Sequence, residues 1–259
     1  MSRAAWVTGA GKGLGRALSL ELARRGCSVA ASARTESDLT TLADDAKPLA
    51  GTVFPFPLDV TDEEATKRTA DAIETTLGPL DVAILNAGTH VEVFAHDFNS
   101  QAFRKLVEVN IMGVVHGLAA LLPRFIERGN GQIVVVASVA GYRGLPSSAA
   151  YGASKAALIN MCESLEPELD GLGVRLSLVN PGFVRTPLTD KNSFPMPFLM
   201  EPEDAARRLI DGIASRRFET TFPRRFTWMM KVLRGLPYAL YFPLTRNLVR
   251  DREMREAQS

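Results

Sequence analysis

The sequence has few of the residues that build metal sites and disulfide frameworks. Its 259 residues include only two cysteines, Cys27 and Cys162, and only three histidines, His90, His96 and His116. The cysteines do not have the spacing of a metal or disulfide motif, and no carboxylates cluster with the histidines at ligand spacing. We therefore expect two buried free thiols in a reducing compartment, and we expect no metal site.

Long hydrophobic runs and a strong charge of one sign are also missing. No stretch has the roughly 18 uncharged apolar residues that a membrane-spanning helix needs. The net charge of +1 gives no general attraction to nucleic acid. Residues 1–11 enter an apolar segment without the pattern of a signal peptide, so we expect a cytoplasmic protein. A composition of 46% hydrophobic and 23% charged residues suits an α/β domain with a sizeable core.

Short apolar runs alternate with longer amphipathic runs along the chain. The predicted strands are residues 4–8, 28–33, 52–59, 82–87, 132–138, 175–181 and 218–223. The predicted helices are residues 13–26, 36–46, 62–77, 99–128, 150–170 and 201–216. This alternation predicts a single doubly wound Rossmann-type domain, a seven-stranded parallel sheet with helices on both faces. Ligands of such sheets bind beyond the carboxyl ends of the strands.

A glycine-rich turn, TGAGKGLG at residues 8–15, follows the first predicted strand. The spacing is G-x-x-x-G-x-G, formed by Gly9, Gly13 and Gly15, because the more common G-x-G-x-x-G would need a glycine at Leu14. Glycines allow a tight turn and a close approach of backbone N–H groups to a pyrophosphate at a helix N-terminus. A tight strand-to-helix connection alone would also explain them. Their place after the first strand favours dinucleotide binding.

Charged residues near this turn bear on the choice of dinucleotide. Arg34 directly follows the second predicted strand, and no acid follows before Glu36 to hold the ribose 2′-hydroxyl of NAD. Lys12 and Arg16 add further positive charge. We therefore expect NADP(H) rather than NAD(H), unless these cations are only solvated surface charges. Asp59, at the end of the third predicted strand, is expected to accept a hydrogen bond from the adenine amino group.

Polar residues also occur where the carboxyl half of the sheet should open. Asn86 follows the fourth predicted strand, Asn110 lies in the long helix 99–128, and Ser138 ends the fifth predicted strand. Tyr151 and Lys155 lie four residues apart, and therefore on one face of the next helix. Singly, these residues are explained as a strand-end turn, a cap or a surface cation. Their joint occurrence in this order indicates a reaction site.

The motifs TGAGKGLG, NAG, YGASK and NPGFVRT, with Asn110 and Ser138 between them, resemble the short-chain dehydrogenase/reductase family over residues 1–190. The resemblance implies hydride transfer between a nicotinamide cofactor and a carbonyl or alcohol. Tyr151 would be the general acid/base, Ser138 would orient the carbonyl, and Asn110 would anchor a proton-relay water. Lys155 would bind the ribose and lower the pKa of Tyr151, because an ammonium favours the phenolate.

The resemblance also assigns the cofactor positions. Thr186, in the NPGFVRT motif, would bind the nicotinamide carboxamide. The full predicted set is Gly9, Lys12, Gly13, Leu14, Gly15, Arg34, Asp59, Val60, Asn86, Ala87, Gly88, Tyr151, Lys155, Pro181, Gly182, Val184 and Thr186.

Substrate specificity is expected from residues 139–147, 90–98 and 188–200. The last segment is rich in phenylalanine and methionine, and either forms a lid over an apolar substrate or packs as an ordinary loop. The predicted substrate residues are Ser138, Val139, Leu145, Tyr151, Phe183, Phe194 and Phe198. The substrate is expected to be a small, hydrophobic carbonyl or alcohol compound.

Residues 224–259 form an extension to the predicted domain of residues 1–223. The extension has eight basic and three acidic residues, a net charge of +5, and the rest of the chain has −4. It is also rich in aromatic residues, so we expect it to cover the pocket, to contact another subunit or to lie on a membrane surface. A homodimer or homotetramer is expected. Pro167 would bend or end the helix 150–170, which commonly pairs subunits in this family.

Two alternatives to this function remain at the level of sequence. One is a non-catalytic NAD(P)-binding regulatory protein, which is disfavoured because Ser138, Tyr151 and Lys155 are all present. The other is an NAD-dependent alcohol dehydrogenase of the same family.

Overall fold

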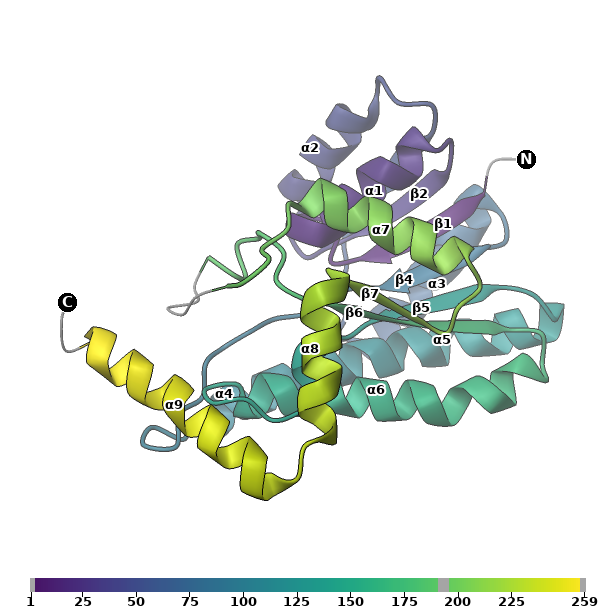
Figure 1. Ribbon diagram of the computed structural model, residues 1–259. Helices are drawn as coiled ribbons and strands as arrows, with labels where there is room; N and C mark the ends of the chain where they lie inside the picture. Colours follow the sequence, from purple (N-terminus) through teal and green to yellow (C-terminus); the bar gives the residue numbers. More distant parts are fainter. Residues whose placement is uncertain (1–2, 191–195, 257–259) are drawn as a thin grey trace.

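Seven parallel strands form one sheet in the computed structural model, which describes residues 3–190 and 196–256. The strand order is β3-β2-β1-β4-β5-β6-β7 (Figure 1). This arrangement confirms the predicted doubly wound sheet. The strands are β1 (Ala4–Thr8), β2 (Ser28–Ser32), β3 (Thr52–Pro55), β4 (Val82–Leu85), β5 (Gln132–Val136), β6 (Arg175–Pro181) and β7 (Glu219–Phe222).

Helices cover both faces of the sheet. Buried side chains of α1, α2 and α7 pack on one face, and those of α3, α5, α6 and α8 pack on the other. Figure 1 shows α1, α2 and α7 above the sheet, with α5 and α6 below it. The helices are α1 (Gly13–Arg24), α2 (Glu36–Ala46), α3 (Glu63–Leu77), α4 (Ser100–Leu106), α5 (Gly113–Arg128), α6 (Ala149–Asp170), α7 (Pro202–Ala214), α8 (Arg224–Gly235) and α9 (Tyr238–Glu256).

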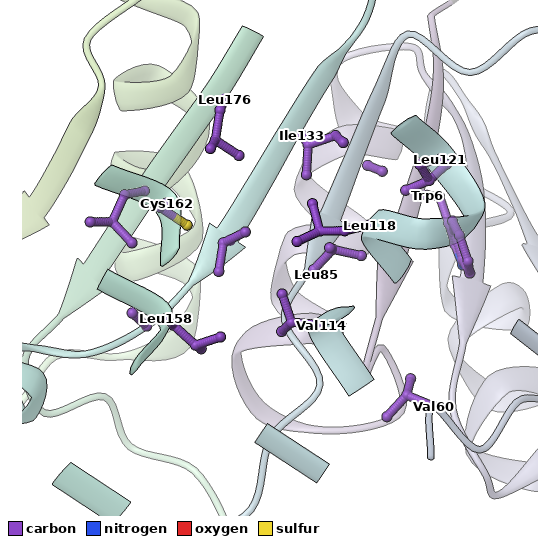
Figure 2. Close-up of a cluster of buried hydrophobic side chains, with 14 of the residues drawn as sticks. Trp6, Val60, Leu85, Val114, Leu118, Leu121, Ile133, Leu158, Cys162 and Leu176 are labelled. Carbon is purple, nitrogen blue, oxygen red and sulfur yellow. The ribbon is translucent and has the colours of Figure 1, made fainter. Parts of the chain in front are cut away.

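Alternate side chains of each central strand build the two cores. In β1, Trp6 points into the core beneath α5, and Val7 points into the core beneath α1 and α7. Figure 2 shows Trp6 in the first core beside Leu121 of α5, with Leu118 of the same helix next to Leu85. Because both faces are covered, the central strands are apolar at successive positions, as the sequence predicted for residues 132–138. Burial of this apolar area is the main stabilising contribution to the fold.

Several element boundaries differ from the prediction. β3 ends at Pro55 and β5 at Val136, so Asp59 and Ser138 lie in the loops beyond these strands. The predicted helix 99–128 contains a π-helical segment, Val107–Met112, between α4 and α5. Pro167 does not end α6, which continues to Asp170. Pro167 is exposed, so water can satisfy the carbonyl oxygen that the proline leaves without a donor.

The helical run Ser100–Arg128 is long and apolar enough to cross a membrane, but half of its apolar window is buried inside the protein. α5 contributes Val114, Leu118 and Leu121 to the core, as a core helix does. Cys27 and Cys162 are both buried and free, as predicted. Burial raises the pKa of the Cys162 thiol to about 12, which disfavours its reactive thiolate form.

Candidate active site

A cavity of about 590 Å³ opens beyond the carboxyl ends of β1, β2, β4, β5 and β6. Every cofactor-binding position predicted from the sequence lines this cavity, as does Ser138. The glycine turn and the Tyr151–Lys155 pair therefore belong to one continuous space, although about 140 residues separate them in the chain.

The glycine turn is packed too closely to accept side chains. A Cβ atom at Gly15 would lie 2.1 Å from the carbonyl oxygen of Gly9. Gly13 has a φ of +54°, and a Cβ there would lie 2.8 Å from Cγ2 of Thr186. Close packing within the protein therefore requires glycine at these positions, and the turn that they form lines the cavity. The tight strand-to-helix turn that the sequence suggested is present.

Asn86 fastens this turn to the end of β4. Its Nδ2 donates to the carbonyl oxygen of Thr8 at 3.0 Å. The hydroxyl of Thr8 in turn accepts hydrogen bonds from the backbone N–H groups of Asn86 and Ala87. These bonds hold the ends of β1 and β4 in register beside the cavity.

The positive charges near the turn have acidic neighbours that the sequence analysis did not single out. Lys12 Nζ lies 3.4 Å from Asp38 Oδ2, and both residues line the cavity together with the exposed Arg34. Arg16 instead pairs with Asp45 on α2. Asp38 lies in the first turn of α2, four residues after Arg34 in the sequence, and this closeness in sequence was the available signal. The cationic end of the cavity is therefore weaker than the sequence alone suggested.

Tyr151 and Lys155 come from the first turns of α6. Burial raises the pKa of the Tyr151 phenol, and a hydrogen bond with Ser138 opposes that shift. Lys155 Nζ donates to the carbonyl oxygen of Val136 at 2.9 Å and lies 5.8 Å from the centre of the Tyr151 ring. Burial lowers the pKa of Lys155 to about 8. The sequence analysis expected Lys155 to lower the pKa of Tyr151, and it did not include burial, which acts in the opposite direction.

Asn110 is fully buried in the π-helical segment and does not line the cavity. Its Nδ2 donates to Thr89 O and Ser154 Oγ, both at 3.0 Å, and its Oδ1 accepts from Thr89 N at 2.7 Å. Ser154 Oγ donates to the carbonyl oxygen of Tyr151 at 2.8 Å. Asn110 therefore connects the loop after β4 to α6. π-Helical turns are frequent at functional sites.

Asn110 and Lys155 approach each other at Gly88. A methyl group at this glycine would lie 3.4 Å from Asn110 Oδ1 and 3.7 Å from Lys155 Nζ. The two side chains thus flank one exposed glycine, although no direct hydrogen bond joins them among the described residues.

Two of the predicted substrate segments come together beside Tyr151. Val93 N donates to Ser147 O at 3.1 Å, which joins the loop 90–98 to the loop 139–147. The His90 ring meets the Tyr151 ring edge-on, with 4.8 Å between centroids. Val139 is buried in the core rather than exposed to the cavity.

Phenylalanine rings gather next to this region, although none of the described phenylalanines lines the cavity. Phe183 and Phe198 both contact Phe226 of α8, with centroid distances of 5.3 and 6.4 Å. Phe226 was not predicted, because only the fold brings α8 to the end of β6. Leu145 is partly buried against the core, and Phe194 lies outside the described residues.

Comparison with known proteins identifies this architecture. A sequence model of the family described as short chain dehydrogenase matches residues 3–195. The chain belongs to the short-chain dehydrogenase/reductase family. It is accordingly an oxidoreductase with an NAD(P)-binding site, and the motif resemblance seen in the sequence is confirmed.

Relatives in this family include an uncharacterized oxidoreductase of Myxococcus xanthus, 42% identical over 95% of this chain and 97% of the relative. The 3-oxoacyl-[acyl-carrier-protein] reductase FabG of Thermotoga maritima is 35% identical over 71% of this chain and 75% of its own length. A short-chain dehydrogenase/reductase from Burkholderia phymatum, solved with NAD, has a TM-score of 0.82 at 26% identity, covering 89% of this chain and 92% of that one.

An alcohol dehydrogenase from the archaeon Thermococcus sibiricus, solved with 5-hydroxy-NADP, is also similar. Its TM-score is 0.77 at 26% identity, and the match covers 86% of this chain and 96% of that chain. The two similar structures thus carry different dinucleotides, and the choice between NAD and NADP depends on this chain's own residues.

Proposed function

We propose that the protein interconverts a carbonyl and an alcohol on a hydrophobic substrate, with NADP(H) as cofactor. The main observation behind this proposal is that the glycine turn and the side chains of Ser138, Tyr151 and Lys155 line the same cavity. Such a cavity accommodates an extended dinucleotide with its reactive ring beside a proton donor.

Tyr151 supplies the proton in the direction of reduction. The nicotinamide ring, when bound, supplies the hydride. Because burial raises the pKa of Tyr151, the phenol keeps its proton near neutral pH, which is the form that can protonate a developing alkoxide. The Ser138 hydroxyl donates a hydrogen bond to the substrate oxygen and stabilises the charge that develops there.

Lys155 acts on the phenolate that remains after the proton leaves. With a pKa of about 8, it is mostly charged at neutral pH and lies on the same helical face as Tyr151. In a buried site, an ammonium at this distance stabilises a phenolate more strongly than in water. Asn110 acts through Ser154, which fixes the backbone carbonyl of Tyr151.

The residues present fit a nicotinamide dinucleotide. The turn at Gly13 and Gly15 would receive the pyrophosphate, and Lys155 would hold the ribose hydroxyls. Thr186 would bind the carboxamide. Asp59 would accept from the adenine amino group, although its Oδ1 already accepts from the backbone N–H and the hydroxyl of Thr61.

The preference for NADP(H) depends on Lys12 and Arg34. Lys12 is 65% exposed in its pair with Asp38, so that ion pair is weak and a 2′-phosphate would compete with the carboxylate for it. Arg34 at the end of β2 is placed for the same phosphate.

We expect NADPH to bind at least about tenfold more tightly than NADH, a difference of about 1.4 kcal/mol. Titration of the purified protein with each, followed by nicotinamide fluorescence, measures it. Lys12→Gln and Arg34→Gln should each reduce NADPH affinity and leave NADH affinity unchanged. Lys47→Gln, an exposed lysine at the end of α2, is the matched control. Tighter binding of NADH would overturn the cofactor assignment and favour an NAD-dependent alcohol dehydrogenase.

The apolar surroundings of the site favour a hydrophobic substrate. Phe183 and Phe198, packed on Phe226, form an aromatic cluster beyond the carboxyl end of β6. The relative from Thermotoga maritima is named as a reductase of a 3-oxoacyl chain, a carbonyl on an apolar substrate. We therefore propose medium-length ketones, aldehydes and 3-oxoacyl thioesters as the first compounds for an assay of NADPH oxidation.

A further inference from the structure

The last two helices expose large apolar side chains at the protein surface. Trp228 is 72% exposed on α8, and Leu240 is 59% exposed on α9. Figure 1 shows α8 and α9 joined in a V at one side of the molecule, with α9 leading away from the sheet. The exposed apolar side chains of these helices include Trp228, Met229 and Val232 on α8, and Leu240 and Leu244, one helical turn apart, on α9.

Other residues hold these helices on the protein, so the exposed side chains are not needed for docking. Phe226 and Met230 of α8 are buried in the core. The guanidinium of Arg143 lies 4.7 Å from the ring centre of Tyr238 and 4.4 Å from that of Tyr241. The Tyr241 hydroxyl donates to the carbonyl oxygen of Gly144. A fixed helix pair that leaves its largest apolar side chains in water indicates a contact surface.

The net charge of residues 224–259 indicates which kind of partner this surface binds. Residues 224–259 carry a net charge of +5 and the rest of the chain −4. Arg224, Arg225 and Arg246 are exposed on the same two helices as the apolar side chains. Two copies that met through this face about a twofold axis would bring like charges together, which is unfavourable. An anionic lipid surface attracts the arginines and receives the apolar side chains.

We propose that α8 and α9 form a membrane-contact face that binds the surface of anionic bilayers. Trp228, Leu240 and Leu244 enter the boundary between headgroups and acyl chains, and the arginines interact with anionic headgroups. Phe226 ties this face to the predicted substrate region, because it is in α8 and contacts Phe183 and Phe198. The residues of this face are separate from the proposed catalytic ones.

The test is co-sedimentation of the full chain with vesicles. Vesicles of phosphatidylcholine mixed with phosphatidylserine should bind the protein, and vesicles of phosphatidylcholine alone should bind it at least about tenfold more weakly. High salt should release it, because about 1 M salt shortens the screening length to roughly 3 Å. Trp228→Glu and Leu240→Glu should each reduce binding about tenfold or more, since each removes a buried apolar contact and adds a repelled charge.

Leu172→Glu is the matched control. Leu172 is 46% exposed beyond the end of α6, so its change adds the same charge to another exposed apolar position. This variant should bind vesicles like the native protein. Reduction of a water-soluble aldehyde should be unchanged in all three variants, which shows that they fold and that the face is independent of catalysis.

Failure of the native protein to bind either kind of vesicle would overturn the proposal. Equal loss of binding in Leu172→Glu would overturn it as well, because charge alone would then explain the effect. Light scattering tests whether a second copy of the chain, and not a membrane, covers this face. If Trp228→Glu and Leu240→Glu convert an oligomer to monomers without changing vesicle binding, the face pairs two copies of the chain and the membrane assignment is wrong.

Discussion

Replacement of Tyr151 by phenylalanine is expected to lower turnover about a thousandfold and to leave nucleotide affinity nearly unchanged. The change removes only the phenolic hydroxyl, which is the proposed proton donor. The aromatic ring remains, so its edge-on contact with His90 and its place in the cavity wall persist. Steady-state kinetics give the turnover, and nicotinamide fluorescence gives the affinity.

Tyr238→Phe is a suitable control for this variant, because it removes the hydroxyl of an exposed tyrosine on α9. It should keep native turnover. Near-native turnover of Tyr151→Phe would remove Tyr151 from the role of acid/base. A large loss of nucleotide affinity in the same variant would mean that the hydroxyl serves mainly in binding.

Replacement of Lys155 by methionine should lower turnover at least about a hundredfold and also change how stability depends on pH. Turnover falls because no ammonium remains to stabilise the phenolate form of Tyr151. The methionine fills the buried space, but it leaves the carbonyl oxygen of Val136 without its present donor. The ammonium of Lys155 therefore has two separate effects. It stabilises the phenolate form of Tyr151 during turnover, and its burial makes the stability of the folded protein depend on pH.

The pH effect follows from the lowered pKa of Lys155. Its pKa falls from the ordinary value of 10.5 to about 8 because burial disfavours the charged form. Below about pH 8 the folded protein bears the full cost of the buried charge. Between about pH 8 and 10.5 the unfolded chain binds the extra proton, so this residue makes the native protein more stable as pH rises, by about 1.4 kcal/mol per pH unit.

Urea unfolding across this range measures the effect as the difference between native protein and Lys155→Met. That difference should move in favour of the native protein between about pH 8 and 10.5, and it should be constant below pH 8. Lys67→Met, which removes an exposed lysine from α3, is the control. If the difference in unfolding free energy between the two proteins does not vary with pH, burial does not lower the pKa of Lys155.

Local patterns explain why much of the site could be predicted from the sequence. The turn at Gly9, Gly13 and Gly15 is a strand-to-helix connection whose spacing itself carries the steric requirement. Tyr151 and Lys155 are neighbours because four residues make one helical turn. The order of strands and helices limits the topology to few choices, and the sheet follows the expected one.

The parts of the site that could not be predicted depend on contacts between segments that are distant in the sequence. Asp38 reaches Lys12 only because α2 packs beside the glycine turn, and Phe226 reaches Phe183 only because α8 lies on the end of β6. The burial that raises the pKa of Tyr151 was not predicted, because the sequence shows the neighbouring lysine but not the depth of burial. Burial is a property of the whole fold.

The most direct test of the proposed function follows the hydride itself. NADPH labelled with deuterium at C4 of the nicotinamide would be incubated with the native protein and an apolar ketone, and the alcohol would be analysed by mass spectrometry. We predict deuterium on the carbinol carbon, transferred from one face of the nicotinamide only. Formation of unlabelled alcohol, or no reduction of any ketone, aldehyde or 3-oxoacyl thioester, would contradict the account.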